Sequence, residues 1–287
     1  MKFIFLGSPK FAEIILKKIL AAGRRPEAVI CNPDRKIGRK QISTPPPTKE
    51  LALKEGLAIL QPEEIDDKLM AEAASFGAEF AIIAAYAKIV PMEFLKIFPR
   101  GVIGIHPSLL PKYRGATPIQ SAILDGADES GVSLYMVDEK MDHGPVIEMT
   151  RIKIGGLDYK TAEENLARAG GELLAAIWDD FQGGQIKLKE QKHTEATFTR
   201  KIKSEDGLVP LPHLRAAIKG EDLKAAEEIY KKILALNPNP GVYIINKGRK
   251  RIKLLKAIIE DEKLVLKKIQ MEGKRPTERF ETGGIFR

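Results

Sequence analysis

The segment Lys2-Phe3-Ile4-Phe5-Leu6-Gly7-Ser8-Pro9 begins the chain and sets the pattern on which the fold is built. Residues 2–6 form the short apolar run of a buried strand, and Gly7-Ser8-Pro9 predicts a turn. Residues 10–22 then carry apolar side chains at the spacing of an amphipathic helix. A strand followed at once by a helix is the unit from which parallel sheets are assembled.

This alternation of strand and helix continues beyond the first unit. Further apolar runs predict strands at 28–31, 58–60, 80–85, 102–105 and 132–137, with helices between them and a long helix over 162–178. Residues 32–47 contain proline, glycine and basic residues without a regular period, so this stretch is expected to be a loop. The sequence therefore predicts an α/β fold around a doubly wound, mostly parallel sheet.

The composition changes near residue 205, where a second domain is predicted to begin. A helix is expected over 222–236, and short alternating segments follow at 242–245, 252–256 and 263–266. Such segments are more typical of a small β-barrel than of another α/β layer. We therefore expect two domains, 1–204 and 205–287.

The net charge of +8 is concentrated in the second predicted domain. Residues 205–287 hold 18 Lys and Arg against 12 Asp and Glu, which gives +6 of the total. A basic domain favours a polyanionic partner such as nucleic acid, because binding releases the counterions of the phosphates. A lysine-rich solvated face is the other interpretation, and charge alone leaves both open.

Several features limit the classes of function. Cys31 is the single cysteine, which excludes an internal disulfide and a thiolate metal cluster. The four histidines stand at no metal-binding spacing, so no metal is expected. The sequence has no apolar run of the length that a membrane helix needs. We expect a monomeric, cytoplasmic protein that does not bind membranes.

Two polar side chains occupy positions suited to chemistry. His106 follows a predicted strand, at the edge where open parallel sheets place their ligands, and Pro107 directs the chain away from the sheet. Asp142 lies in the turn Met141-Asp142-His143-Gly144-Pro145, and a carboxylate near His106 would orient the imidazole and favour its charged form. Taken singly, a structural histidine and an ordinary turn are the favoured interpretations of these two residues.

Together, these residues carry a longer pattern. The run His106-Pro107-Ser108-Leu109-Leu110-Pro111-Lys112-Tyr113-Arg114-Gly115, with Met141-Asp142-x-Gly144, resembles the HxSLLPxYRG signature of the folate-dependent formyltransferase family. Segments 3–12, 32–39, 85–91, 226–230 and 236–241 are also similar to that family. The resemblance covers almost the whole chain and is greatest to members that act on methionyl-tRNA. It implies a Rossmann-like core followed by a small OB-like barrel that contacts tRNA.

The resemblance also implies a reaction and its residues. A formyl group would pass from 10-formyltetrahydrofolate, the co-substrate, to the methionine amine of initiator methionyl-tRNA, which supports translation initiation. Protonated His106 would donate a hydrogen bond to the developing oxyanion, and Asp142 would hold the imidazole charged. Folate contacts are expected from Ser108, Leu109, Leu110, Pro111, Tyr86, Ala87, Lys88, Ile89, Val137, Asp138 and Glu139. Contacts with tRNA are expected from Arg35, Arg39, Lys40, Lys250 and Arg251.

The match departs from the family pattern at the catalytic site. Gly104 stands where the family has an asparagine, whose amide would be a second oxyanion donor, and losing one such donor costs about 100- to 1000-fold in turnover. The protein is then a slow enzyme, an enzyme in which a water or another residue substitutes, or an inactivated relative. If the donor is missing, Gly104→Asn should raise formyl transfer.

Departures elsewhere concern the folate and the acceptor. Ala87 replaces a usual glycine, Asn239 replaces a usual tryptophan, and residues 207–226 differ from the family pattern. Two alternative functions remain. One is formylation of a small amine, such as glycinamide ribonucleotide or an amino sugar nucleotide. The other is tRNA or folate binding with weak activity, because Gly104 lacks the amide.

Overall fold

The computed structural model describes residues 1–38 and 41–286. These residues form two compact units, whose bounds extend over Met1–Ala116, Ser130–Lys153 and Glu163–Phe198 in the first and over Thr117–Glu129, Ile154–Ala162 and Thr199–Arg287 in the second. The predicted domain boundary between residues 204 and 205 stays a prediction. No helix in the described part of the chain has the length and apolar character needed to cross a membrane.

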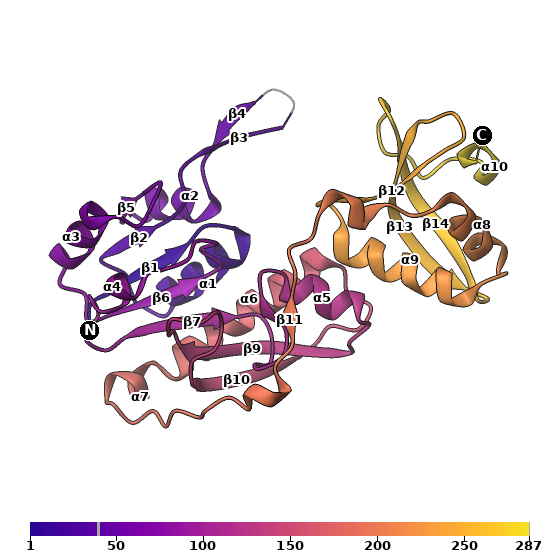
Figure 1. Cartoon of the computed structure of the whole chain (residues 1–287). Coiled ribbons are helices and arrows are strands. Elements are labelled where there is room, and N and C mark those ends of the chain that lie inside the picture. The colour runs from indigo at the N-terminus through magenta and orange to yellow at the C-terminus, as the bar shows by residue number, and fades with distance from the viewer. Residues whose placement is uncertain (39–40, 287) are drawn as a thin grey trace. The chain divides into compact units, whose positions relative to one another are not determined.

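The first unit is built on a sheet that has seven strands among the described residues (Figure 1). Their order across the sheet is β10-β9-β7-β6-β1-β2-β5, and the strands from β7 to β5 pair in parallel. β9 pairs with β7 in the antiparallel direction. The strands are β1 (Phe3–Gly7), β2 (Ala28–Ile30), β5 (Ala58–Leu60), β6 (Phe80–Ala84), β7 (Val102–His106), β9 (Glu129–Met136) and β10 (Val146–Lys153). The predicted mostly parallel sheet is confirmed.

Helices cover both faces of this sheet because its strands are apolar on both faces. Ile4 and Leu6 belong to one core cluster with buried residues of α3 and α4. Phe3 points to the opposite face, where its ring packs against Trp178 of α7 at 5.1 Å between centroids. The helices of this part of the chain are α1 (Lys10–Ala21), α2 (Pro47–Lys54), α3 (Asp67–Ser75), α4 (Met92–Leu95), α6 (Tyr159–Ala176) and α7 (Trp178–Gln182).

Small elements that the sequence did not predict complete this unit. The expected loop over 32–47 instead contains an antiparallel hairpin of β3 (Arg35–Ile37) and β4 (Ile42–Thr44). Strands of three mostly polar residues are too short to show a period of two, which is why the pattern failed. The signature loop also contains β8 (Arg114–Gly115), which pairs with β11 (Phe198–Thr199), and η1 (His193–Glu195) lies just before β11.

The second unit ends in an antiparallel sheet of β12 (Val242–Ile245), β13 (Arg251–Glu260) and β14 (Lys263–Met271). The expected small barrel domain thus contains three strands among the described residues, with single bridges at Leu208 and Thr277 extending its two edges. Its other elements are α5 (Pro118–Leu124), η2 (Ser204–Gly207), α8 (Leu211–Lys219), α9 (Leu223–Leu236) and α10 (Thr282–Ile285). α8 was not predicted, because Pro212 looked like a breaker, whereas proline is tolerated in the first turn of a helix.

Candidate active site

His106 is the last residue of β7, and its side chain is almost fully buried. Its Nε2 lies 2.8 Å from the carbonyl oxygen of Tyr113. Because a carbonyl can only accept, Nε2 carries a proton and donates it in this bond. The other ring nitrogen, Nδ1, faces Oδ2 of Asp142 at 3.6 Å. The imidazole is therefore held by a hydrogen bond at Nε2, and its Nδ1 is directed at a carboxylate.

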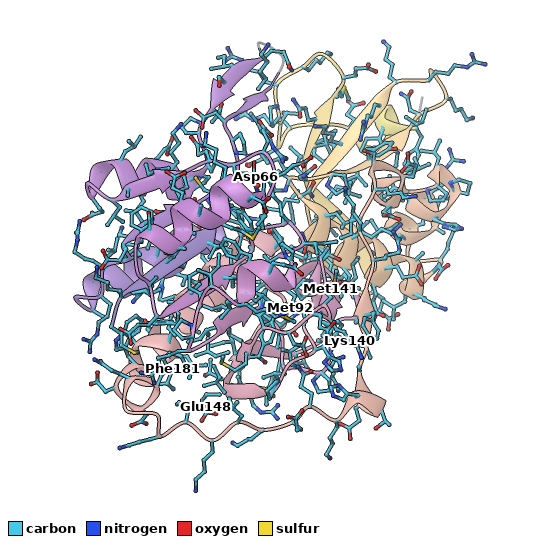
Figure 2. All side chains as sticks on the ribbon, turned by 60° about the vertical axis from the view of Figure 1, so that its left-hand side comes forward. Asp66, Met92, Lys140, Met141, Glu148 and Phe181 are labelled. Atoms are coloured by element: carbon cyan, nitrogen blue, oxygen red, sulfur yellow. The ribbon has the colours of Figure 1, made fainter. Side chains whose placement is uncertain are left out.

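Asp142 is held by donors on both of its carboxylate oxygens. The hydroxyl of Tyr135 donates to Oδ1 at 2.8 Å, and the backbone N–H of Gly115 donates to Oδ2 at 2.7 Å. Asp142 lies in the turn that begins at Met141, which Figure 2 labels together with Lys140, and it has a left-handed φ of 50°. The structure thus brings together the histidine and the carboxylate that the sequence predicted as neighbours.

A buried arginine supports this turn from the signature loop. The Arg114 guanidinium is almost fully buried and donates from Nη2 to Oε1 of Gln191 at 2.6 Å and to Nδ1 of His193 at 2.9 Å. Gln191 in turn donates from Nε2 to the carbonyl oxygens of Asp142 at 3.0 Å and Gly144 at 2.7 Å. The network links the signature to the Asp142 turn. Gln191 was not predicted, since no motif marks it in the sequence.

Two further histidines stack beside this network. The rings of His143 and His193 are parallel with centroids 4.1 Å apart, and Nδ1 of His143 lies 2.7 Å from Oδ2 of Asp138. Partial removal from water, together with neighbouring His143 and Arg114, holds the pKa of His193 below its ordinary value. Among residues 1–38 and 41–286, no group of three or more His, Cys, Asp or Glu side chains could hold a metal ion.

The loop predicted to contact folate is fixed to β9 through one serine. Ser133, which pairs with His106 across the sheet, donates from Oγ to the carbonyl oxygen of Ser108 at 2.7 Å. The same Oγ accepts the N–H of Leu110 at 3.0 Å. Ser108 is itself fully buried, and its Oγ donates to the carbonyl of Lys112. Hydrogen bonds within the protein therefore fix the backbone conformation of residues 108–111.

The three segments predicted to contact folate converge in the structure. Leu110, Tyr135 and Val146 form a small apolar cluster, and Val137 packs both against it and against the larger core cluster that contains Tyr86. Within the segment Tyr86–Ile89, Ile89 is 90% exposed. An exposed apolar residue at the carboxyl ends of parallel strands suits a flat aromatic ligand.

Individual residues of these segments have different roles. Ala87 has a left-handed φ of 63°, which explains why glycine suits this position. Lys88 directs its Nζ to the carbonyl oxygens of Pro62 and Glu63, so it anchors its loop. The Asp138 carboxylate accepts from the N–H of Lys140, whereas Glu139 is exposed.

The residues predicted to contact tRNA are distributed over both units. Arg35 lies exposed on β3, while Arg39 and Lys40 lie outside the described residues. Lys250 is exposed immediately before β13. Arg251, the first residue of that strand, stacks its guanidinium over the Tyr243 ring at 3.5 Å from the centroid.

The position of Gly104 is filled by a residue from the neighbouring strand. Gly104 pairs with Tyr135, and a Cβ added to the glycine would lie 2.3 Å from Cε1 and 2.8 Å from the hydroxyl oxygen of Tyr135. The prediction that Gly104→Asn raises formyl transfer is untested, and in this structure it requires Tyr135 to move, because the asparagine would overlap this ring. Tyr135 was not predicted as a site residue, since only strand pairing brings it to Gly104.

Sequence comparison extends the resemblance over both units. Residues 1–176 match the family described as formyl transferase, and residues 223–275 match the formyl transferase C-terminal domain.

The chain belongs to the formyl transferase family.

Relatives in this family share a substantial part of the sequence. Methionyl-tRNA formyltransferase of Chloroflexus aurantiacus is 35% identical over 263 residues, which cover 90% of this chain and 80% of the relative. The enzyme of the same name from Symbiobacterium thermophilum is 36% identical over 262 residues, which cover 90% and 76%.

Solved formyl transferase structures share the fold. Methionyl-tRNA formyltransferase from Clostridium thermocellum superposes with a TM-score of 0.61 at 16% identity, covering 94% of this chain and 98% of the other. An N-formyltransferase from Helicobacter canadensis, in complex with folinic acid and dTDP-3-aminofucose, gives 0.64 at 18% identity, covering 91% and 89%. At these identities the likeness concerns the fold alone.

Proposed function

We propose that this protein transfers the formyl group of 10-formyltetrahydrofolate to the methionine amine of initiator methionyl-tRNA and so supports translation initiation. The observation that carries this proposal is the match to methionyl-tRNA formyltransferases at 35–36% identity over nine-tenths of the chain, through the C-terminal domain. The net +6 charge of residues 205–287 supports an RNA acceptor.

The arrangement of His106 and Asp142 suits attack of an amine on a formyl carbon. As the amine nitrogen bonds to that carbon, negative charge develops on the formyl oxygen, and a preorganised N–H donor stabilises it. The Nε2–H of His106, which bonds to Tyr113 in the absence of substrate, supplies such a donor. Asp142 faces Nδ1 and stabilises the charged imidazole. The amine then loses its proton, the bond from carbon to the folate nitrogen breaks, and that nitrogen takes up a proton.

The folate co-substrate is assigned to the surface formed by Ser108–Pro111, Tyr86–Ile89 and Val137–Glu139. Backbone groups contribute much of the binding, because Ser108 and Lys88 are already committed to hydrogen bonds within the protein. Leu110 and Val137 supply an apolar wall. Gly104 provides room for Tyr135, whose hydroxyl donates to Asp142, so the missing amide donor remains the argument for the weakly active alternative.

The tRNA contacts are assigned to Arg35, Arg39, Lys40, Lys250 and Arg251, and the two domains to 1–204 and 205–287. We also propose a cytoplasmic, monomeric enzyme. The cytoplasmic location is proposed because the acceptor of the formyl group is a charged tRNA. Light scattering at micromolar concentration tests the oligomeric state, and a mass of twice 31.8 kDa would contradict it.

A formylation assay separates this function from its alternatives. The protein is incubated with 10-formyltetrahydrofolate and, separately, charged initiator tRNA, glycinamide ribonucleotide or an amino sugar nucleotide. We expect turnover with the tRNA. Turnover with a small amine alone would show that the acceptor is wrong, and tRNA binding without turnover of any acceptor would show that the chain is not an active enzyme. His106→Ala, which removes the imidazole, is the negative control.

A further inference from the structure

We propose that Tyr135 is a positioning residue for formyl transfer, whose hydroxyl holds the Asp142 carboxylate toward His106. Gly104, which has no side chain, leaves the space that the Tyr135 ring needs to reach Asp142. This inference rests on the proposed function. It concerns a side chain outside the signature run and outside the residues predicted for the site.

Strand pairing explains how the tyrosine arrives there. β7 and β9 are antiparallel, and Gly104 pairs with Tyr135 while His106 pairs with Ser133. Residues two apart on a strand share a face, so Tyr135 lies on the same face of the sheet as His106. With only a hydrogen at position 104, the ring can lie across the backbone of β7, at a distance that any Cβ would prevent.

The hydroxyl acts as a donor. Tyr135 is only 7% exposed, and its hydroxyl oxygen lies 2.8 Å from Oδ1 of Asp142. Burial, and then the negative charge of Asp142, raise the pKa of Tyr135 well above its ordinary value, so the phenol keeps its proton. An ionised carboxylate can only accept, and therefore the proton of this hydrogen bond belongs to Tyr135.

As a result, both oxygens of the Asp142 carboxylate have partners within the protein. Oδ1 is bound by Tyr135, and Oδ2 is shared between the N–H of Gly115 and Nδ1 of His106. Two donors from two different strands prevent rotation of the carboxylate about its bond to Cβ. Charged groups nearby are Arg114 and Asp138, whose effects on Tyr135 have opposite sign. The hydroxyl is thus the group that fixes the side of Asp142 remote from the imidazole.

The test compares Tyr135→Phe with the wild-type protein. Phenylalanine keeps the ring over Gly104 and removes only the donor, so the melting temperature should change little. We expect kcat to fall about 10- to 100-fold, as for loss of one hydrogen bond to a charged group, with KM for the folate unchanged. Tyr230→Phe, the same chemical change on α9, is the matched control and should leave kcat unchanged.

A double-mutant cycle tests the part of Gly104. Gly104→Ala should displace the ring and lower kcat to a similar extent, and the double variant Gly104→Ala/Tyr135→Phe should be little worse than either single variant, because both remove the same contact. Losses in kcat that multiply would show that Gly104 and Tyr135 act independently. Unchanged kcat in Tyr135→Phe would overturn the positioning role.

A second readout does not depend on catalysis. The N–H of Gly115 donates to the same carboxylate, so its hydrogen exchange, followed by NMR, should accelerate in Tyr135→Phe while amides of β1 stay protected. An unchanged rate at Gly115 would show that the hydroxyl does not hold Asp142. If the wild-type protein formylates no acceptor, the proposed function fails, but this exchange rate still decides whether Tyr135 positions the carboxylate.

Discussion

At the scale of the residue, the site depends on a glycine and an aromatic ring that face each other across two strands. Gly104 supplies space, and Tyr135 uses that space to reach Asp142. A glycine in a strand weakens the sheet unless another group packs over it, and here the Tyr135 ring does so. The substitution at 104 is therefore interpretable only together with its partner.

A direct consequence concerns the variant Gly104→Asn. Its side chain would overlap the Tyr135 ring, so we expect lower turnover and a loss of stability of about 1–3 kcal/mol, as in other overpacked sites. The double variant Gly104→Asn/Tyr135→Leu, with a smaller side chain at 135, should recover part of the stability but not the turnover, because it also removes the Tyr135 hydroxyl. Turnover and thermal denaturation measure the effect. Gly283→Ala, at a glycine with open space around it, is the control. Gly104→Asn with undiminished stability would contradict the overlap.

At the scale of the element, short hydrogen-bonded turns fix the ends of the larger elements. Asp206 in η2 is one example. The Arg200 guanidinium donates hydrogen bonds to both of its carboxylate oxygens, at 2.6 and 2.8 Å, and the N–H of Lys203 donates to it as well. This bidentate pair, and then the N–H of Lys203, lower the pKa of Asp206 to about 2. This turn lies between β11 and α8.

The expected pH dependence follows from the sign of that shift. A carboxylate with a lowered pKa in the folded state stabilises above its unfolded pKa of about 3.9, and the gain is lost as pH falls through about 2. The wild-type protein should therefore exceed Asp206→Asn in free energy of unfolding above about pH 4, by less than about 1 kcal/mol because Arg200 is exposed. Chemical denaturation between pH 2 and 6 measures this difference.

The control for this measurement is Asp180→Asn, an exposed aspartate in the first turn of α7. Its difference from the wild-type protein should vary less with pH. If the Asp206→Asn difference stayed constant from pH 6 to pH 2, the ion pair with Arg200 would not contribute to folding stability.

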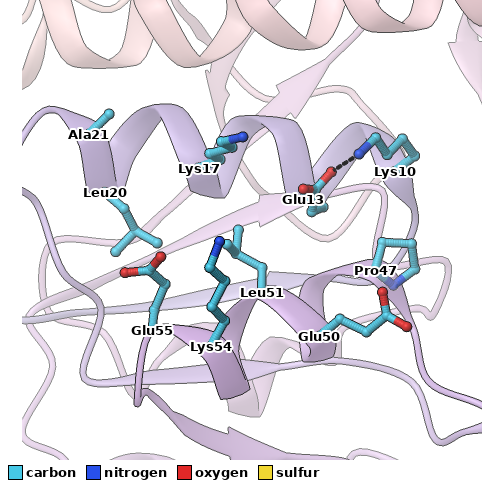
Figure 3. Close-up of a pocket in the computed structure, with 10 residues that line it drawn as sticks. All are labelled: Lys10, Glu13, Lys17, Leu20, Ala21, Pro47, Glu50, Leu51, Lys54 and Glu55. Atoms are coloured by element: carbon cyan, nitrogen blue, oxygen red, sulfur yellow. Dashed lines mark ion pairs between the residues drawn. The ribbon is translucent and has the colours of Figure 1, made fainter.

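At the scale of the whole molecule, two regions differ in their charge and therefore in the ligands that they attract. The groove between α1 and α2 in Figure 3 has charges of both signs, including an ion pair between Lys10 and Glu13 at 2.5 Å. By contrast, residues 205–287 carry a clear excess of positive charge. A long anionic partner is expected to contact the latter, because only an excess of one sign attracts polyanions over a distance.

The salt dependence of tRNA affinity tests this assignment. We expect log Kd to rise linearly with log salt, and Lys250→Ala should reduce that slope by about one because it removes one phosphate contact. Lys68→Ala, an exposed lysine on α3, should leave the slope unchanged. Filter binding or fluorescence titration between 50 and about 200 mM salt measures it. A Kd that does not change with salt concentration would show that residues 205–287 do not bind the tRNA phosphates.

The sequence by itself determined the local elements and the family. Apolar runs at 2–6, 80–85 and 102–105 predicted strands because burial on both faces of a parallel sheet requires continuous apolar sequence. The signature from His106 to Gly115 identified the family because it is long and specific. It also placed His106 at a strand end, which the structure confirms.

Only the tertiary structure decided which side chains meet. Tyr135 and Gln191 are 31 and 87 residues from Gly104 in sequence, and no local pattern indicates that they approach the signature loop. Antiparallel pairing of β9 with β7 sets Tyr135 opposite Gly104, and the buried Arg114 sets the place of Gln191. Contacts between distant segments depend on strand register and on the pairing of buried polar groups, and a single sequence encodes neither in a local period.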